Sequence, residues 1–238
     1  MTIENKNFTT VDIMIACHNR AKDIEKLINH FYKIECPTNI KFFIRIVDDC
    51  SSDNSVAIIK SLQKKYSTLS LIENKENKGL FYNRYLLLNE SNADYIFFID
   101  DDDDVSDNLF SEFAKHLNCD LIRTIRKFIN GNDSYVKFKN QDLNLTKPSE
   151  MFTKINLHYC TGIFISKHVY KQILNLLDEL KIDNLYLNMR EDIFYFYLMV
   201  NFARNFVLIS SYYDYFITTN GLSLAVKKNT LYNDSLTI

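Results

Sequence analysis

Glycine and proline are scarce in this sequence of 238 residues, with only four and two residues of each. Those few are scattered, so no stretch has the Gly/Ser-rich or Pro-rich composition of a flexible linker. The chain also contains no internal repeat and no low-complexity tract. Because nothing marks a domain boundary, we expect one compact domain over residues 1–238.

The sequence also lacks a long apolar run and a block of basic residues. No apolar stretch reaches the roughly 18 residues that span a bilayer, and the N-terminal segment MTIENKNFTT is polar. We therefore expect a cytoplasmic protein. The net charge is −2 and Lys and Arg do not cluster, so we expect no nucleic-acid partner.

Cysteine and histidine do not form a recognisable framework. The five cysteines are odd in number and never spaced as CxxC, and the five histidines are dispersed. This pattern favours reduced thiols over a disulfide framework or a zinc site. No His-based metal site is visible in the sequence.

What the chain does contain is a strict alternation of strand-like and helix-like segments. Short apolar runs predict strands, and apolar residues at helical spacing predict the helices between them. Such an alternation over ~100 residues predicts an α/β fold with a parallel sheet wrapped by helices. The expected strands are 11–16, 40–47, 68–73 and 94–99, and the expected helices are 21–35, 51–66, 79–90 and 106–117.

The strongest local feature is the run IFFIDDDDDV at residues 96–105, in which an apolar strand leads into five aspartates. At an effective dielectric of about 20, two unit charges ~4 Å apart repel by roughly 4 kcal/mol. The run therefore either raises its own pKa values or holds a hard divalent cation. If strand alternation persists, Asp100, Asp102 and Asp104 face one side together. The alternative is a solvated acidic loop that merely ends the strand.

Further polar residues follow the other predicted strands. In open α/β sheets the ligand crevice lies outside the carboxyl ends of the strands, so a nucleotide-sized ligand could touch all of these segments. For Asp48 alone, helix capping is an equally good explanation, because DDCSSDNS is rich in cap formers. The residues at these strand ends are Ala16, Cys17, His18, Asn19, Arg20, Asp48, Asp49 and the aspartate run.

Five segments occur in a telling order: IACHNR, IVDDCSSDNS, ENKGLFYNRY, FFIDDDDDV and MREDIFYF. Together they resemble the inverting family-2 glycosyltransferases of the GT-A fold, over about residues 11–223 and best over the first ~110. The resemblance implies a Rossmann-like, mostly parallel central sheet flanked by helices. It also implies a nucleotide-sugar-binding half, about residues 11–118, and an acceptor-binding half, about residues 119–238.

The resemblance implies a site for a nucleotide sugar, most simply a UDP-sugar. Asp49 resembles the uracil-binding aspartate of the family, with Asp48 beside it and the backbone near Ala16 lining the base. Arg84 takes the place of a basic residue that faces the nucleotide or diphosphate, and the alternative is a surface arginine on an exposed helix. The implied donor-binding set is Ala16, Cys17, Asn19, Arg20, Asp48, Asp49, Arg84, Asp100 and Asp101.

Asp100 and Asp102 match the family's Asp-X-Asp pattern. The resemblance implies that they hold Mn²⁺ or Mg²⁺, mainly through Asp102, and that the cation bridges to the diphosphate. Such an ion neutralises the charge that grows on the departing diphosphate. Mg²⁺ is usually bound by one or two carboxylates plus substrate phosphates, and Mn²⁺ accepts similar ligands, which agrees with this assignment.

Glu191 and Asp192 begin a strongly apolar segment that predicts a helix. Acidic residues are favoured at the positive end of a helix, so simple capping is one explanation for the pair. The resemblance implies instead that Asp192 is the general base that removes the acceptor proton, with Glu191 as its acceptor-binding neighbour. Attack opposite the leaving group inverts the anomeric centre without a covalent intermediate.

Three glycines fall in turns that match the family: Gly79, Gly162, which we place after a candidate strand, and Gly221. Gly131, in a polar stretch, predicts a hairpin turn. The C-terminal segment YYDYFITTNGLSLA departs from the family, since Phe216 stands where a basic residue is frequent and Asn220–Gly221 replaces Gly-Ser.

The resemblance implies transfer of a sugar to a hydroxyl of a glycan or lipid-linked saccharide, with peripheral association at the inner face of a membrane. A haloacid-dehalogenase-type phosphatase with Asp101 as nucleophile and Asp103 as acid/base is an alternative, although its motif belongs after an early strand. A nucleotidyltransferase would need a Gly-rich loop after its first strand, and ACHNRAKD has none. An EF-hand would need glycine at Val105 and glutamate at Ser111. A non-catalytic nucleotide-sugar-binding scaffold stays open.

Overall fold

The computed structural model describes residues 8–131, 133–136, 148, 150, 159–181 and 191–217. Its strands form one sheet in the order β3-β2-β1-β4-β8-β6-β9-β5, with β7 paired to β6. The strands are β1 Thr9–Cys17, β2 Ile40–Asp48, β3 Leu69–Glu73, β4 Tyr95–Phe98, β5 Asp104–Val105, β6 Leu121–Asn130, β7 Asp133–Val136, β8 Ile163–Ser166 and β9 Phe206–Phe216.

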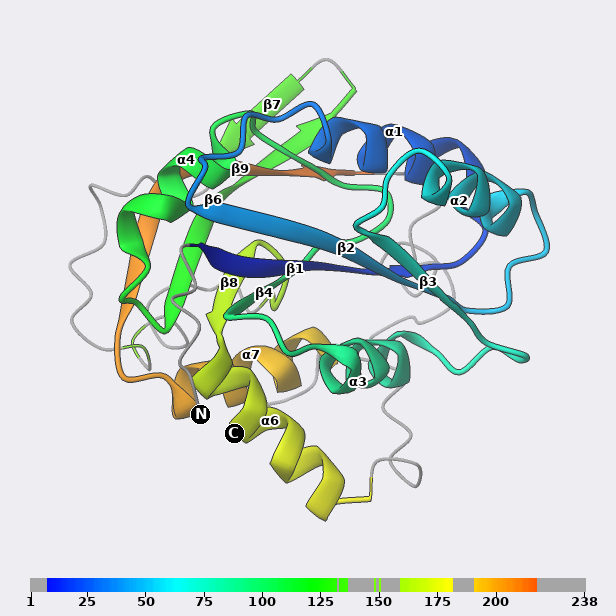
Figure 1. Cartoon of the computed structure of the whole chain (residues 1–238). Helices are drawn as coiled ribbons and strands as arrows, with labels where there is room; N and C mark the ends of the chain where they lie inside the picture. The colour runs from blue at the N-terminus through cyan, green and yellow to red at the C-terminus, as the bar shows by residue number, and fades with distance from the viewer. Residues whose placement is uncertain are drawn as a thin grey trace, which may run out of the picture.

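Helices cover both faces of this sheet, with α1 and α2 on one side and α3, α6 and α7 on the other (Figure 1). Within the described residues, no helix has both the length and the apolar character that a bilayer span requires. The helices are α1 Ala21–Phe31, α2 Ser55–Gln63, α3 Leu80–Glu90, α4 Leu109–Phe113 with the 3₁₀ turn Ala114–His116 after it, α6 Lys167–Glu179 and α7 Glu191–Phe202.

The first half of the sheet is parallel, as the alternation of segments predicts. Strand β1 pairs in parallel with β2 and β4, and β2 pairs in parallel with β3. Every strand and helix expected between residues 11 and 117 is present, within a few residues of its expected bounds. The α/β prediction with a Rossmann-like sheet is therefore confirmed.

Alternating side chains of the strands build two separate apolar layers. Val11 and Ile13 of β1 pack under α1 and α2, whereas Met14 faces the opposite layer, which contains α3, α6 and α7 residues. The helical spacing of Ile24 and Phe31 places both side chains in the first layer. Burial on both faces explains why the central strands read as nearly continuous apolar runs.

The second half adds strands that the sequence does not locate. Strand β8 runs antiparallel to both β4 and β6, and β9 lies parallel to β6 and antiparallel to β5. Gly131, at φ +60°, turns the chain between β6 and β7, which confirms the predicted hairpin. Gly162, at φ +75°, directly precedes strand β8, and residues 151–158 before it lie outside the described residues. Asn220 and Gly221 lie outside the described residues.

Candidate functional site

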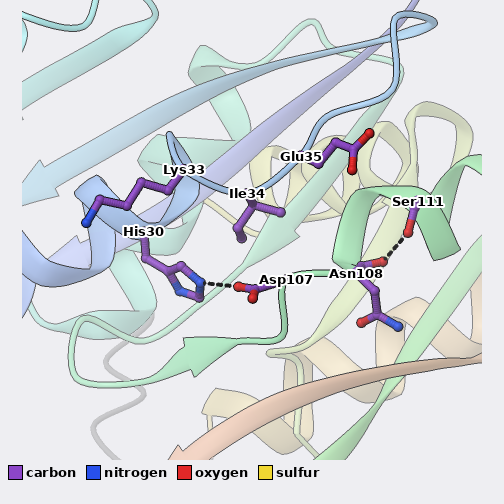
Figure 2. A pocket seen from close by; sticks show the side chains of 7 residues that line it. All are labelled: His30, Lys33, Ile34, Glu35, Asp107, Asn108 and Ser111. Atoms are coloured by element: carbon purple, nitrogen blue, oxygen red, sulfur yellow. Dashed lines mark hydrogen bonds and ion pairs between the residues drawn. The ribbon is translucent and has the colours of Figure 1, made fainter.

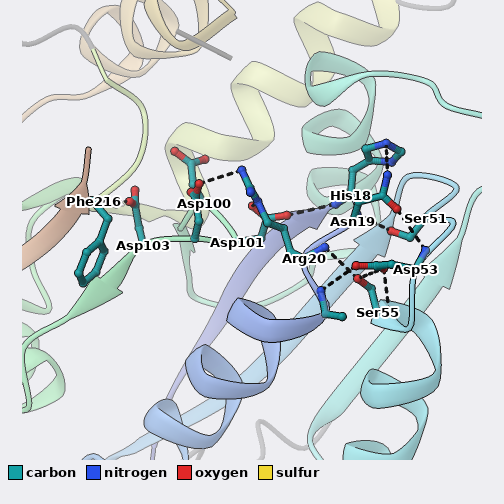
Figure 3. A network of polar contacts seen from close by, with 12 residues as sticks. His18, Asn19, Arg20, Ser51, Asp53, Ser55, Asp100, Asp101, Asp103 and Phe216 are labelled. Carbon is teal, nitrogen blue, oxygen red and sulfur yellow. Dashed lines mark hydrogen bonds and ion pairs between the residues drawn. The ribbon is translucent and has the colours of Figure 1, made fainter. Parts of the chain in front are cut away.

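The carboxyl ends of β1, β2 and β4 bring three polar loops together (Figure 3). The Asn19 backbone N–H donates to Ser51 Oγ at 2.9 Å, and the Arg20 N–H donates to Ser55 Oγ at 2.9 Å. The His18 backbone N–H donates to Asp101 Oδ2 at 3.1 Å. The three loops expected to share a ligand crevice therefore contact one another directly.

Strand alternation does not continue into the aspartate run. Strand β4 ends at Phe98 and the chain turns at residues 100–102, so neighbouring carboxylates point in different directions. Asp100 bonds to Arg84, whereas Asp102 bonds to Arg20, so the expectation that Asp100, Asp102 and Asp104 share one side fails. The reason is local, since a turn has no period of two.

Each remaining aspartate of the run also has its own partner. Asp103 accepts hydrogen bonds from the Tyr213 hydroxyl at 2.6 Å and from the Phe216 N–H at 3.1 Å. Asp104 pairs with Lys26 at 3.3 Å and with the His30 ring. A solvated acidic loop would leave such carboxylates to water, so the structure does not support that alternative. The phosphatase alternative needs Asp101 and Asp103 to face one substrate. The structure does not support it either, because Asp101 bonds to His18 and Arg20 whereas Asp103 bonds to Tyr213 and Phe216.

Arg20 forms ion pairs with Asp101 and Asp102 in the aspartate run. Its Nε donates to Asp101 Oδ1 at 3.3 Å and its Nη2 donates to Asp102 Oδ2 at 2.9 Å. The Asp102 side chain keeps about a fifth of its surface exposed, at 21%. Asp102 therefore combines one cationic partner with access to solvent.

Arg84 is buried, with 2% of its side chain exposed, so it is not a surface arginine. Its Nη2 donates to Asp100 Oδ1 at 3.1 Å and its Nη1 donates to Asp192 Oδ1 at 2.6 Å. Glu191 lies 3.7 Å from the same guanidinium. The Arg84 guanidinium therefore connects the aspartate run to the start of α7. Because it is buried, it is not exposed to a ligand in solvent.

The acidic pair Glu191 and Asp192 forms the first turn of α7, where the helix dipole favours negative charge. Burial alone would raise the pKa of Asp192, but Arg84 and the thiol of Cys160 outweigh it and hold that pKa below its usual range. Burial raises the pKa of Glu191, and the neighbouring Asp192 charge adds to this. Asp192 is therefore ionised at neutral pH, as a general base must be before it accepts a proton.

Burial also changes the acidity of the aspartate run. It raises the pKa of Asp100 to about 6 and the pKa of Asp101 to about 7, with repulsion from neighbouring carboxylates adding to both. The pKa of Asp103 is raised well above its usual range for the same two reasons. Burial and repulsion between carboxylates therefore outweigh the opposing effects of Arg84 on the pKa of Asp100 and of Arg20 on the pKa of Asp101.

Within the described part of the chain, no group of three or more His, Cys, Asp or Glu side chains is arranged to hold a metal ion. The donor set still fits a hard cation that takes its remaining ligands from phosphate. Asp100 and Asp102 would supply carboxylate oxygens, and both side chains are partly exposed, at 29% and 21%. One or two carboxylates are the usual protein contribution to such a site.

Asp48, the last residue of β2, and Asp49 after it are both buried. Asp48 accepts the Ser51 N–H at 2.9 Å, a cap-like contact, and its Oδ1 has no hydrogen-bond partner in the described residues. Asp49 accepts hydrogen bonds from the Lys78 and Gly79 N–H groups at 2.7 and 2.9 Å, and from Asn74 at 2.9 Å. Asp49 therefore orders the turn before α3.

The residues after β1 also have protein partners. The Cys17 side chain is 1% exposed and lies in the apolar layer, so it offers only its backbone to a ligand. Ala16 is half-buried in β1. The Asn19 amide oxygen accepts the Ser52 and Asp53 N–H groups at 2.8 and 3.3 Å, and so joins the first two loops.

Two residues at this site carry no signal that sequence reasoning used. Cys160 donates its thiol to Asp192 at 3.0 Å, although the two lie 32 residues apart. The Tyr213 hydroxyl accepts the Asp100 N–H at 3.1 Å, across 113 residues. Cys160 lies two residues before Gly162, and Tyr213 lies in the C-terminal segment YYDYFITTNGLSLA, but neither spacing nor periodicity singles them out.

A separate hollow of about 610 Å³ lies between the end of α1 and the start of α4 (Figure 2). None of the predicted site residues lines it. His30 lies at the edge of the hollow. Its ring bonds to Asp107 through Nε2 at 2.9 Å and to Asp104 through Nδ1. This hollow therefore adjoins only the far end of the aspartate run. It is lined by His30, Lys33, Ile34, Glu35, Asp107, Asn108 and Ser111.

Comparison with known proteins agrees with this architecture. The model of the family described as "Glycosyl transferase family 2" matches residues 12–174. Among solved structures, S. aureus TarS 1–349 in complex with UDP-GlcNAc superposes with a TM-score of 0.70 at 18% identity, covering 91% of this chain and 60% of that one. A structure of the same TarS segment with UDP gives a TM-score of 0.68 at 18% identity, covering 88% and 61%. These structural matches establish the fold, which confirms the GT-A prediction.

Two curated relatives match parts of the chain. Poly(ribitol-phosphate) beta-N-acetylglucosaminyltransferase TarS of Staphylococcus aureus is 24% identical over 123 residues, which is 50% of this chain and 21% of TarS. The uncharacterized glycosyltransferase MG060 of Mycoplasma genitalium is 27% identical over 143 residues, which is 55% of this chain and 48% of that protein. The matched part is thus about a fifth of the first relative and about half of the second.

Proposed function

Because this chain belongs to glycosyl transferase family 2, we propose that it moves a sugar from a nucleotide sugar to a hydroxyl group, with inversion at the anomeric carbon. The expected donor is a UDP-sugar and the expected acceptor a glycan or lipid-linked saccharide. A solved structure of S. aureus TarS contains UDP-GlcNAc, which makes this donor the first to test. Peripheral attachment to a membrane stays a prediction, as does the cytoplasmic location.

One observation carries this proposal: the Arg84 guanidinium joins Asp100 and Asp192, at 3.1 and 2.6 Å. Asp100 belongs to the loop proposed to face the diphosphate, and Asp192 is the proposed base. The two groups lie 92 residues apart in sequence (192 − 100) yet share one cation. An inverting transfer needs the leaving group and the general base on opposite sides of the anomeric carbon. By bonding to both Asp100 and Asp192, Arg84 would fix the distance between the two proposed groups.

The proposed chemistry assigns a role to each group. The Asp192 carboxylate takes the proton of the acceptor hydroxyl as its oxygen attacks the anomeric carbon, and the bond to the diphosphate oxygen breaks on the opposite side. Glu191 is proposed to bind the acceptor beside it. Asp102 and Asp100 would hold Mn²⁺ or Mg²⁺, which supplies positive charge to the departing diphosphate.

The donor pocket is proposed at the three joined loops. Asp48 and Asp49 are proposed to bind the uracil base, and hydrogen bonds from Asn74, Lys78 and Gly79 hold the Asp49 carboxylate in place. Arg20 forms ion pairs with Asp101 and Asp102, and its side chain is partly exposed. It is therefore proposed to contact a phosphate while it keeps these ion pairs. Arg84 is proposed to act on the diphosphate only through Asp100, because it is buried.

A thermal-shift screen tests the donor assignment. UDP-GlcNAc, other UDP-sugars and UDP, each with and without Mn²⁺, are compared with GDP- and ADP-sugars. A ligand at a concentration 100-fold above its Kd stabilises the folded state by about 2.7 kcal/mol, so specific binding is readily detected. Stabilisation by a UDP-sugar that depends on the metal is expected. Equal response to all nucleotides, or none, contradicts the assignment.

A non-catalytic scaffold would pass that binding test, so turnover has to be measured separately. The expected result is release of UDP from the donor that stabilises the protein, increased by a saccharide acceptor and abolished in Asp192→Asn. Metal-dependent donor binding without UDP release under any acceptor condition would favour the scaffold.

A further inference from the structure

Cys160 lies in the turn before β8, completely buried, and its Sγ is 3.0 Å from Asp192 Oδ1. A free thiol is a weak hydrogen-bond donor and seldom has a polar role. Here the thiol faces the carboxylate proposed as the general base. Burial raises the pKa of the thiol, and Asp192 raises it further against the opposing effect of Arg84, so the group keeps its proton and donates it.

Two hydrogen bonds end on the same oxygen of Asp192. Arg84 Nη1 donates to Oδ1 at 2.6 Å, and Cys160 Sγ donates to Oδ1 at 3.0 Å. Within the described residues, no hydrogen bond ends on Oδ2. The Asp192 side chain is 29% exposed, so part of it is open to an incoming molecule. The carboxylate is thus divided into a held oxygen and an available one.

A carboxylate held by one donor can still rotate about its Cβ–Cγ bond. The guanidinium and the thiol approach Oδ1 from different segments, α3 and the turn before β8, and two donors fix the plane that one donor leaves free. The arrangement matters for catalysis because a misplacement of about 1 Å in a reacting group can cost about 100-fold in rate.

Building on the proposed function, we infer that Cys160 is a positioning residue, which, with Arg84, holds Asp192 Oδ1 so that Oδ2 faces the acceptor hydroxyl. The acceptor proton then passes to Oδ2 as the new glycosidic bond forms, and the electron pair of the broken bond leaves with the diphosphate. Cys160 contributes no proton and forms no covalent bond. Its role is the orientation of the base.

A matched pair of variants tests this role. Cys160→Ser and Cys160→Ala both remove the sulfur, but only serine keeps a donor toward Oδ1. Cys160→Ala is expected to lower kcat about 10-fold while KM for the donor sugar stays within about twofold, because only the oriented base is lost. Cys160→Ser is expected to keep at least about half of the wild-type kcat. Equal kcat in the two variants, or full activity in Cys160→Ala, overturns the proposal.

A control and a spectroscopic measurement make the test independent of turnover. Cys36→Ser changes a half-buried cysteine far from the site and is expected to leave kcat unchanged. The S–H infrared band of Cys160, obtained by subtracting the Cys160→Ser spectrum, is expected to shift to higher frequency in Asp192→Ala. An unshifted band overturns the inference even if the chain transfers no sugar, whereas a shifted band without turnover would contradict the proposed function alone.

Discussion

Arg84 and Asp192 form a 2.6 Å ion pair across 108 residues of sequence. The arginine is buried and three acidic side chains surround it: Asp100, Glu191 and Asp192. Removal of a buried charge leaves its partners uncompensated, which costs more than the pair itself contributes. This one guanidinium therefore joins the stability of the fold to the geometry of the proposed reaction.

Arg84→Met is expected to lower the free energy of unfolding by about 3 kcal/mol, because the surrounding carboxylates lose their shared cation. Arg84→Lys keeps the charge but cannot reach two carboxylates with a planar fork, so it is expected to fold better and still lose catalysis. Urea denaturation of both variants measures the stability. Wild-type stability in Arg84→Met would show that the pairs contribute little.

Stability is expected to fall as the pH rises from 5.5 to 7.5 in the absence of divalent metal. The pKa of Asp101 is about 7 and that of Asp100 about 6 in the folded chain, above the ordinary value near 3.9 that an unfolded chain shows. A carboxyl with a raised folded pKa stabilises the fold at low pH, and this contribution is lost as the pH rises through the folded value. The expected loss is about 2–3 kcal/mol.

Urea midpoints at the two pH values measure this loss. Asp101→Asn mimics the protonated carboxyl and is expected to flatten the pH dependence. Asp133→Asn alters an exposed carboxylate in β7 and serves as the control. Stability that rises with pH in the wild type would contradict the raised pKa values.

Asp102→Ala is expected to weaken Mn²⁺-dependent binding of UDP by at least about 10-fold, since a principal proposed ligand is lost. Binding without metal should change little. Titration calorimetry with UDP, with and without Mn²⁺, measures both. Asp104→Ala removes a neighbouring carboxylate that bonds to Lys26 and His30 instead, so it is the matched control. Unchanged metal-dependent affinity in Asp102→Ala removes this residue from the metal site.

Asp192→Asn is expected to leave the affinity for the donor within about twofold and to lower kcat by roughly 10²–10⁴, the usual contribution of a general base. Asparagine can still accept hydrogen bonds through its Oδ1, so the local structure should persist. Steady-state kinetics with the donor found in the binding screen measures kcat and KM separately. An active Asp192→Asn enzyme would assign the base to another residue.

Gly162→Ala and Gly79→Ala separate backbone strain from close packing. Both glycines have positive φ, at +75° and +81°. A Cβ at Gly162 would lie 2.9 Å from the Tyr213 ring and from Thr124 Oγ1, whereas a Cβ at Gly79 meets nothing within 4 Å. Gly79→Ala is expected to cost about 1 kcal/mol, and Gly162→Ala about 3 kcal/mol because overpacking adds to the strain.

Thermal or urea denaturation compares the two variants. Gly162→Ala should also weaken UDP binding with metal, since Tyr213 holds both Asp100 and Asp103. Equal cost in both variants would mean that the Tyr213 ring moves aside freely.

The sequence by itself determined the parallel half of this protein. Ile13, Ile44 and Phe97 sit in short apolar runs separated by amphipathic segments, and local periodicity is enough to predict strands and helices from such patterns. The sequence also predicted that the loops after Cys17, Asp48 and Phe98 lie close together, because parallel strands end at the same edge of a sheet.

Only the tertiary structure decided where each carboxylate of the run points and which residues surround the base. The chain leaves strand geometry after Phe98, so no period relates Asp100 to Asp102. The burial of Arg84 depends on α3 packing against elements far along the chain, and the contact between Cys160 and Asp192 joins segments 32 residues apart. A local sequence pattern shows which face of a helix or strand is buried. Contacts between side chains far apart in sequence depend instead on how all the helices and strands pack together.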